Sequence, residues 1–263
     1  FPPHPKRSRI TINNCADGES PMLLKKLFSR SSTKLVACSA PLAVAICLSC
    51  LPEIPATPAN AQQPPAVQGE PTPHRETSTP YTGDLSRFEY PDRDKKLQVN
   101  RVMDLLGIAP GKTVADIGAG SGWFSVRAAR RVTQTGTVYA VDINPEAVKY
   151  IQERAKREGI GNIKTILGQA GDPLLPPRSI DAALLLKAYH EVAEPVALLK
   201  NLRQSLRPGA RIGIIDRNGT ADNHGVNEDI VLREAQQAGY SLVGKYDFVR
   251  GDDEDYFLVF KAS

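Results

Sequence analysis

The order of secondary-structure patterns from residue 95 to the C-terminus constrains the fold of this 263-residue chain more than any other feature. Short apolar runs of β-rich composition alternate there with segments that have helical spacing. The strand-like runs are residues 113–117, 137–141, 163–167, 180–186 and 210–215, and the helical segments are 95–106, 123–131, 145–158, 194–206 and 228–238. This alternation predicts a mainly parallel sheet with helices on both faces.

Two further β-rich stretches, residues 240–249 and 256–260, complete the chain. The acidic residues 252–255 lie between them and are expected to form a solvated turn. Because a short turn joins the two stretches, they must pair as antiparallel strands. We therefore expect residues 81–263 to form a single α/β domain.

The part of the chain that precedes this predicted domain divides into three segments. Residues 1–21 are expected to be an unstructured extension. Residues 22–61 have the layout of an export signal, because basic residues precede an apolar run and Ala59-Asn60-Ala61 has the small-x-small pattern of a cleavage site. Residues 62–80 are rich in Pro, Thr and Gln and predict a disordered linker.

The apolar run 35–51 decides between a signal peptide and a membrane anchor. Its length is near the lower limit for a helix that crosses a bilayer, and Pro41 interrupts it. A removed signal peptide is therefore favoured, and membrane contact is expected only if the leader stays uncleaved. The predicted location is exported, either periplasmic or secreted, with residues 35–51 as the anchor if they are retained.

Charge and cysteine content limit the function of the predicted domain. Residues 1–61 hold seven Lys and Arg against three acidic residues, so the rest of the chain holds 26 of each sign. The domain is formally neutral, which removes the argument for a nucleic-acid partner. All four cysteines precede Ala61, so a thiolate nucleophile and a cysteine zinc site are excluded from the domain.

A glycine-rich loop, DIGAGSG at residues 116–122, follows the first predicted strand. Its alternating glycines lack a Cβ, so a ligand can lie against bare backbone. Asp142 ends the next predicted strand, 20 residues beyond Gly122. In a βαβ unit a carboxylate at this spacing lies beside the loop and can accept hydrogen bonds from both ribose hydroxyls. Together these features predict a ligand that contains adenosine.

Dinucleotide-binding loops use the same arrangement with the pattern G-x-G-x-x-G or G-x-G-x-x-A. Here Trp123 occupies the sixth position, where an indole would obstruct close packing of strand and helix, and Gly122 comes one residue too early. The spacing argues against NAD. An NAD-dependent oxidoreductase is therefore the less favoured alternative.

These motifs, with VD at residues 141–142 and RPGARI at 207–212, resemble those of class I S-adenosylmethionine-dependent methyltransferases, and the resemblance extends from near Arg93 to the C-terminus. Within that superfamily the chain most resembles the small-molecule branch related to ubiquinone and menaquinone methyltransferases, in particular exported members. The resemblance implies a Rossmann-like, doubly wound sheet of seven strands, mostly parallel, with the last strand inserted antiparallel. It also implies S-adenosylmethionine as the cofactor and transfer of its methyl group to a small molecule.

The resemblance further implies which residues bind the cofactor. By residue they are Asp116, Gly118, Ala119, Gly120 and Gly122 near the methionine end, Asp142 at the ribose, Ile143 against the adenine, and Gln169 or Asp172 at the purine edge. The choice between Gln169 and Asp172 stays open.

Catalytic candidates follow from the position of the fourth strand. In parallel sheets the chemistry lies beyond the carboxyl ends of the strands, which points to residues 187–191. Methyl transfer from a sulfonium needs alignment and exclusion of water more than covalent help, so few catalytic residues are expected. His190 and Tyr189 can bind an acceptor oxygen or take its proton, and they are the candidates.

No metal is expected. A divalent-metal mechanism of the catechol type would need a carboxylate at Lys187 to act with Asp216 and Asn218. The second alternative is a module that binds S-adenosylmethionine but has lost catalysis, because the donor is made in the cytoplasm and an exported enzyme needs a supply of it.

Overall fold

The computed structural model describes residues 75–77 and 80–263. The predicted extension at 1–21, the predicted export signal at 22–61 and most of the predicted linker at 62–80 lie outside the described residues. Within them, no helix combines the length and the apolar character that spanning a membrane requires.

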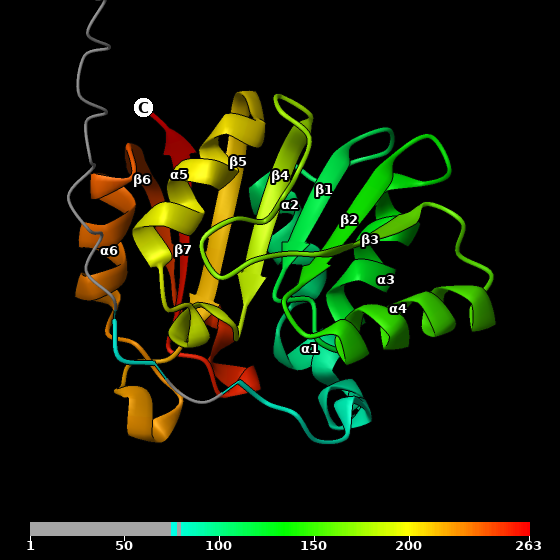
Figure 1. Ribbon diagram of the computed structural model, residues 1–263, viewed down its shortest axis with the longest axis horizontal. Helices are drawn as coiled ribbons and strands as arrows, with labels where there is room; N and C mark the ends of the chain where they lie inside the picture. The colour runs from blue at the N-terminus through cyan, green and yellow to red at the C-terminus, as the bar shows by residue number, and fades with distance from the viewer. Residues whose placement is uncertain (1–74, 78–79) are drawn as a thin grey trace, which may run out of the picture. The chain divides into compact units, whose positions relative to one another are not determined.

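One seven-stranded sheet forms the centre of the described chain (Figure 1). Its strands are β1 (Thr113–Ile117), β2 (Thr137–Asp142), β3 (Ile163–Leu167), β4 (Ile180–Leu186), β5 (Leu206–Asp216), β6 (Tyr240–Tyr246) and β7 (Tyr256–Ala262). Their order across the sheet is β3-β2-β1-β4-β5-β7-β6. The pairings from β3 to β5 are parallel, whereas β7 pairs antiparallel with both of its neighbours. The prediction of seven strands with one inserted antiparallel is confirmed.

The helical elements of the described part are of two kinds. The α-helices are α1 (Arg93–Lys96), α2 (Val99–Leu106), α3 (Trp123–Val132), α4 (Pro145–Arg157), α5 (Pro195–Ser205) and α6 (Glu228–Gln237). The short 3-10 helices are η1 (Leu85–Glu89), η2 (Tyr189–Glu191), η3 (Ala221–Asn223) and η4 (Phe248–Asp252).

Helices cover both faces of the sheet, as the alternating pattern predicts, and each face has its own core (Figure 1). On one face α5 and α6 bury side chains such as Leu199 and Val231. On the other, α2 and α3 bury Met103 and Phe124, and α4 adds Ile151. The sheet is therefore a rigid platform whose strand ends position the loops.

Local sequence explains where α4 begins. The Asn144 side chain accepts a hydrogen bond from the Glu146 amide at 2.9 Å, and Pro145 occupies the first helical position, where a missing N–H costs little. Because the helix begins there, Asp142 and Ile143 stay at the carboxyl end of β2. This edge of the sheet is the one at which ligands of α/β folds bind.

The helix predicted over residues 95–106 is divided in two. Gln98 adopts a left-handed φ of 52°, which ends α1 and starts α2 in a new direction. Its side-chain amide donates to the Phe248 carbonyl at 3.2 Å, and Leu97 beside it is fully buried. The contact to Phe248 is distant in sequence, so helical spacing alone does not reveal the break.

Two strands differ in extent from the prediction. β5 begins at Leu206 rather than at residue 210, because Leu206 pairs with Ile180 beyond a register shift. β6 ends at Tyr246, and the rest of the predicted strand 240–249 leads into η4, where Phe248 packs edge-on against a Phe257 ring in β7.

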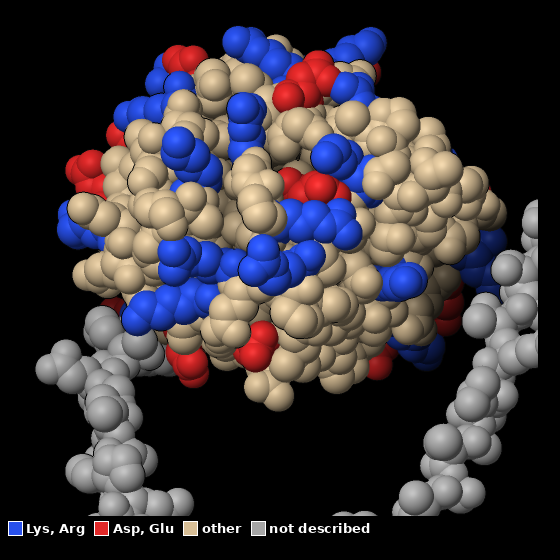
Figure 2. Space-filling model, turned by 90° about the horizontal axis from the view of Figure 1, so that it is seen from above, with Lys and Arg blue, Asp and Glu red and all other residues tan. Residues whose placement is uncertain are grey.

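The amino ends of the parallel strands lie on the face shown in Figure 2, where Lys and Arg side chains are spread with Asp and Glu among them. Asp181, near the start of β4, pairs with Lys112 at 3.3 Å and with Arg207 at 2.7 Å. Charges of both signs are thus mixed on this end of the sheet, away from the cavity at the opposite end.

Candidate functional site

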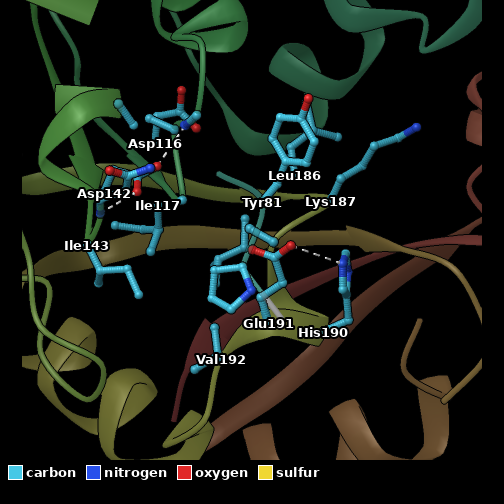
Figure 3. A pocket seen from close by; sticks show the side chains of 18 of the residues that line it. Tyr81, Asp116, Ile117, Asp142, Ile143, Leu186, Lys187, His190, Glu191 and Val192 are labelled. Atoms are coloured by element: carbon cyan, nitrogen blue, oxygen red, sulfur yellow. Dashed lines mark hydrogen bonds and ion pairs between the residues drawn. The ribbon is translucent and has the colours of Figure 1, made fainter. Parts of the chain in front are cut away.

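A cavity of about 660 Å³ opens at the carboxyl ends of β1, β2 and β4. Its volume lies within the range of small-molecule sites, about 300 to 1,000 Å³. Figure 3 shows Asp116, Asp142 and Ile143 on one side of the cavity, with Lys187 and His190 on the other. The cavity therefore has a wall made by the glycine loop and β2, and a second wall made by the segment after β4.

The glycine loop leaves β1 and lies against the end of β2. The amides of Gly118 and Ala119 both donate to the Val141 carbonyl, at 2.9 and 3.0 Å. Gly118 has φ +70°, and a Cβ there would lie 2.5 Å from the Ala188 Cβ. Gly120 has φ +53°, but a Cβ there would meet only a Phe88 ring atom at 3.9 Å, because it would point into the cavity. The loop thus gives a ligand access to bare backbone.

Asp142 lies beside this loop, as the spacing predicts. One carboxylate oxygen accepts from the Gly120 amide at 2.8 Å, and the other accepts from the Asn144 amide at 2.9 Å. Burial raises the pKa of Asp142, although these backbone hydrogen bonds act in the opposite direction. Each oxygen keeps further lone-pair capacity for a ligand, since an ionised carboxylate has about four acceptor sites.

Asp116 lines the deeper part of the same wall and is 2% exposed. Its carboxylate accepts a hydrogen bond from the Ser125 hydroxyl at 2.6 Å. Burial raises the pKa of Asp116 to about 7, against the lowering effect of Ser125. The residue is thus poised to hold either a proton or a cationic group of a ligand.

The residues expected at the adenine differ in their placement. Ile143 lines the cavity and is about half exposed, so its apolar surface is available to a ligand. Gln169 also lines the cavity. Asp172 instead uses a carboxylate oxygen to accept from the Leu174 amide at 2.8 Å. Of these two residues, only Gln169 therefore faces the cavity.

Two predicted cofactor-binding residues are absent from the described lining of the cavity. These are Asp172, which closes its own turn, and Gly122. Gly122 precedes α3 and faces α4, where an added Cβ would lie 3.0 Å from an Ile151 side-chain carbon. Gly122 therefore allows close packing of two helices behind the loop and does not offer a surface to the ligand.

His190 lies in η2 on the second wall and is 7% exposed. Its Nδ1 lies 2.9 and 3.0 Å from the two carboxylate oxygens of Asp216, which also accepts from the His190 backbone amide at 3.0 Å. Burial alone would lower the pKa of His190, but the hydrogen bond and charge of Asp216 outweigh it and raise the pKa. Since Asp216 accepts at Nδ1, the ring nitrogen Nε2 is left for the cavity.

Tyr189 does not join His190 at the cavity. Its side chain is fully buried in the core beneath α5 and α6, and its hydroxyl donates to Glu234 at 2.8 Å. The prediction that Tyr189 is catalytic is therefore not supported by its placement. Successive residues of a 3-10 turn point in different directions, so His190 faces the cavity while Tyr189 faces α6.

The acidic run at residues 252–255 is only in part the solvated turn that the sequence predicts, because Asp253 and Asp255 are exposed but the other two residues are not. Asp252 and Glu254 are 1% and 3% exposed. The Lys187 ammonium lies 2.7 Å from a Glu254 carboxylate oxygen, and Arg93 Nε lies 3.3 Å from a carboxylate oxygen of Asp252. Their cationic partners come from the end of β4 and from α1, far away in the sequence, which is why local composition misleads here.

Sequence reasoning gave no role to several polar residues that line the cavity, among them Arg93, Arg217 and Glu254. Arg93 stacks over the Trp123 ring at 4.3 Å and is 4% exposed. One carboxylate oxygen of Glu254 has no hydrogen-bond partner within the described residues. None of the three belongs to a spaced motif, so only the folded arrangement reveals them.

Comparison with known proteins adds a family match. A family model described as a methyltransferase domain matches residues 108–241, which is just over half of the chain. The matched residues include the glycine loop, Asp142 and the segment after β4.

Two curated relatives match similar parts of the chain. A nocamycin O-methyltransferase of Saccharothrix syringae is 32% identical over 114 residues, which cover 43% of this chain and 41% of the relative. A ubiquinone/menaquinone biosynthesis C-methyltransferase of Hydrogenovibrio crunogenus is 28% identical over 160 residues, which cover 60% of this chain and 61% of the relative. The match thus spans less than two thirds of either relative.

The fold has solved counterparts. The crystal structure of a SAM-dependent methyltransferase from Aquifex aeolicus superposes with a TM-score of 0.61 at 23% identity, and the match covers 68% of this chain and 98% of that one. The two chains share the same fold.

Proposed function

Because the chain belongs to the methyltransferase domain family, we propose that it transfers the methyl group of S-adenosylmethionine to a small molecule bound in the cavity at the carboxyl ends of β1, β2 and β4. The approach of the Gly120 backbone to the Asp142 carboxylate at one wall of this cavity carries the proposal. The names of the two relatives, one for nocamycin and one for ubiquinone/menaquinone biosynthesis, support a small acceptor.

The wall formed by the glycine loop and β2 has the chemistry that an adenosyl donor needs. Gly120 leaves a space that a Cβ would fill, Asp142 can accept from ribose hydroxyls, and Ile143 offers an exposed apolar surface to an adenine ring. Asp116, deep beside the loop, can receive a cationic amino group. S-adenosylmethionine, when bound, supplies a methyl group that its sulfonium already activates.

The second wall would hold the acceptor. Asp216 fixes the His190 ring, so that Nε2 is the nitrogen available to the cavity. A ring held in one orientation can bind an acceptor hydroxyl without losing further side-chain freedom. Methyl transfer requires the exclusion of water, and the burial of His190 limits the access of water to its ring.

The experiment that tests this function is calorimetry with S-adenosylhomocysteine and NAD, followed by a methyl-transfer screen over quinols, phenols and small acids. We expect binding of S-adenosylhomocysteine, no binding of NAD, and methylation of at least one class of acceptor. Tight binding of NAD without binding of S-adenosylhomocysteine would replace the proposal with an oxidoreductase. Binding of S-adenosylhomocysteine without turnover of any acceptor would favour an inactive binding module.

We also propose that the chain is exported, on the basis of the basic, apolar and small-residue regions of residues 22–61. The proposal is tested by fusing residues 22–61 to a reporter enzyme that is active only outside the cytoplasm. The fusion is expected to be active, and deletion of residues 35–51 is expected to abolish that activity. Equal activity of the two fusions would refute export.

A further inference from the structure

Three side chains with metal-binding groups meet at the second wall of the cavity, which we call the acceptor wall: His190, Glu191 and His224. One ligand atom from each lies within 4.8 Å of the ligand atoms of the other two. A Glu191 carboxylate oxygen lies 3.8 Å from His190 Nε2, and Figure 3 shows the two side chains turned toward each other. The His190 and His224 rings lie edge to face, 5.9 Å between centroids.

His190 is oriented in the way a metal ligand is. Metal-binding histidines usually give their other ring N–H to a carboxylate, which fixes the tautomer and aims the free nitrogen at the ion. Asp216 does this here, since it is fully buried and lies 2.9 and 3.0 Å from His190 Nδ1. The nitrogen that remains, Nε2, is the one that faces Glu191.

The loop that carries His224 is held to the same strand end. Arg217, the residue after Asp216, donates from Nε to the His224 carbonyl at 3.0 Å and from a terminal nitrogen to the Asn223 carbonyl. His224 itself has a left-handed φ of 53° at the end of η3, and its side chain is exposed. The Arg217 contacts therefore keep an exposed histidine beside a buried one, although the two histidines follow different strands of the sheet.

We propose that His190, Glu191 and His224 bind a divalent transition-metal ion of the zinc type, and that the ion holds a hydroxyl oxygen of the methyl acceptor. Two imidazoles and one carboxylate, with at least one position left open, form the ligand set of catalytic zinc sites. Imidazole favours zinc, copper, iron and nickel, whereas magnesium and calcium prefer ligand sets made of oxygen. The part that concerns the acceptor rests on the proposed methyltransferase function, while the ion site does not.

The ion would give the acceptor hydroxyl the reactivity that it lacks when free. A divalent ion lowers the pKa of an oxygen bound to it, so the hydroxyl proton leaves to water near neutral pH. A lone pair of that oxygen then forms a bond to the methyl carbon of the sulfonium donor. The carbon–sulfur bond breaks, and its electron pair stays on sulfur. The products are a methyl ether, a thioether and one proton, so the acceptor class is an alcohol or a phenol.

This site differs from the metal site that the sequence argues against. The expectation of no metal rests on Lys187, which stands where a catechol-type site needs a carboxylate. The cluster begins three residues later and reaches across to the loop after β5, so it depends on a different set of ligands. Spacing along the chain does not reveal it, because His224 comes from another strand end.

The test is titration of the full, metal-stripped chain with Zn²⁺ by calorimetry and with Co²⁺ by visible absorption. Cysteines in residues 1–61 can also bind these ions, so the readout is the difference between the wild type and matched variants. The ligand variants are His224→Ala and Glu191→Gln. The control is Asp222→Asn, which removes an acidic group from the same exposed loop without touching a ligand.

We expect the wild type and Asp222→Asn to bind one more equivalent of metal than the ligand variants, or to bind that equivalent more than about 100-fold more tightly. All four proteins should bind S-adenosylhomocysteine alike, because the ligands lie on the opposite wall from Asp142. Equal metal binding by the wild type, His224→Ala and Glu191→Gln would overturn the site. Methylation of an acceptor that persists in excess chelator would overturn the role in catalysis, and metal binding without any methylation would count against the proposed function alone.

Discussion

Single residues of the loop after β1 have separable roles, because a Cβ would meet different surroundings at each glycine. At Gly118 it would collide with Ala188, whereas at Gly120 it would project into the cavity. The first glycine therefore serves packing and the second serves access to the ligand. A substitution at each position should affect different quantities.

We expect Gly118→Ala to lower the free energy of unfolding by about 2 kcal/mol or more, because it combines positive-φ strain with a steric clash. Gly120→Ala should cost about 1 kcal/mol of strain but weaken the binding of S-adenosylhomocysteine at least tenfold. Urea unfolding and calorimetry measure the two effects. Similar losses of stability in both variants, with unchanged affinity in Gly120→Ala, would show that the loop does not contact the ligand.

The ionisation of Glu254 should be visible in the pH dependence of stability. Burial raises the pKa of Glu254 from 4.5 to about 7, although Lys187 lowers it. Between these values the folded chain binds more protons than the unfolded chain, so the free energy of unfolding should fall as the pH rises from about 4.5 to about 7.

Glu254→Gln lacks this ionisation and should show a flatter profile across the same window, with a difference of about 1 to 3 kcal/mol between its ends. Urea unfolding at several pH values gives the comparison, and Glu153→Gln serves as the exposed control. Parallel profiles for the wild type and Glu254→Gln would mean that Glu254 is ionised throughout the range.

At the scale of elements, the sequence predicts those features whose cause is local. β1 and β4 are recognised because their apolar runs are buried almost throughout, and α4 because Asn144 and Pro145 mark its start. The break at Gln98 is not predicted, because its contact to Phe248 joins residues 150 positions apart. Distant partners are likewise the reason why Asp252 and Glu254, in the acidic run before β7, are buried although the sequence predicts a solvated turn.

The segment η2 shows how one short element serves both the core and the cavity. Tyr189→Phe should lower the free energy of unfolding by about 1 kcal/mol, because it removes the hydrogen bond to Glu234. Turnover of the acceptor should stay within about twofold of the wild type, since the hydroxyl faces α6. A large loss of kcat with unchanged stability would instead show that Tyr189 takes part in catalysis, as the sequence predicts.

At the scale of the whole molecule, the cavity is assembled from segments that the sheet brings to one edge. The sequence predicts the wall made by the glycine loop and β2, here called the donor wall, because the loop and Asp142 belong to one βαβ unit with known geometry. It predicts the acceptor wall only in part. Arg93, Glu254 and His224 come from α1, from the segment before β7 and from the loop after β5, so only the tertiary structure places them together.

Ligand binding should stabilise the described domain as a unit. At a concentration of S-adenosylhomocysteine 100 times its Kd, the free energy of unfolding should rise by about 2.7 kcal/mol, because the ligand binds the folded state alone. Thermal unfolding with and without ligand measures the change. The same concentration of NAD should leave the transition unchanged, and an equal shift with NAD would contradict the specificity of the donor wall.

The convergence of the Gly120 backbone and the Asp142 carboxylate on one adenosyl ligand is tested most directly by titrating S-adenosylhomocysteine into the wild type, Asp142→Ala and Asp181→Ala by calorimetry. Asp181 is the control, because it is a paired carboxylate at the other end of the sheet. We predict one ligand per chain in the wild type, equal affinity in Asp181→Ala, and at least tenfold weaker binding in Asp142→Ala, because hydrogen bonds to a charged group contribute about 1.5 to 3 kcal/mol each. Equal affinity in Asp142→Ala and the wild type, or no binding by the wild type, would contradict the account.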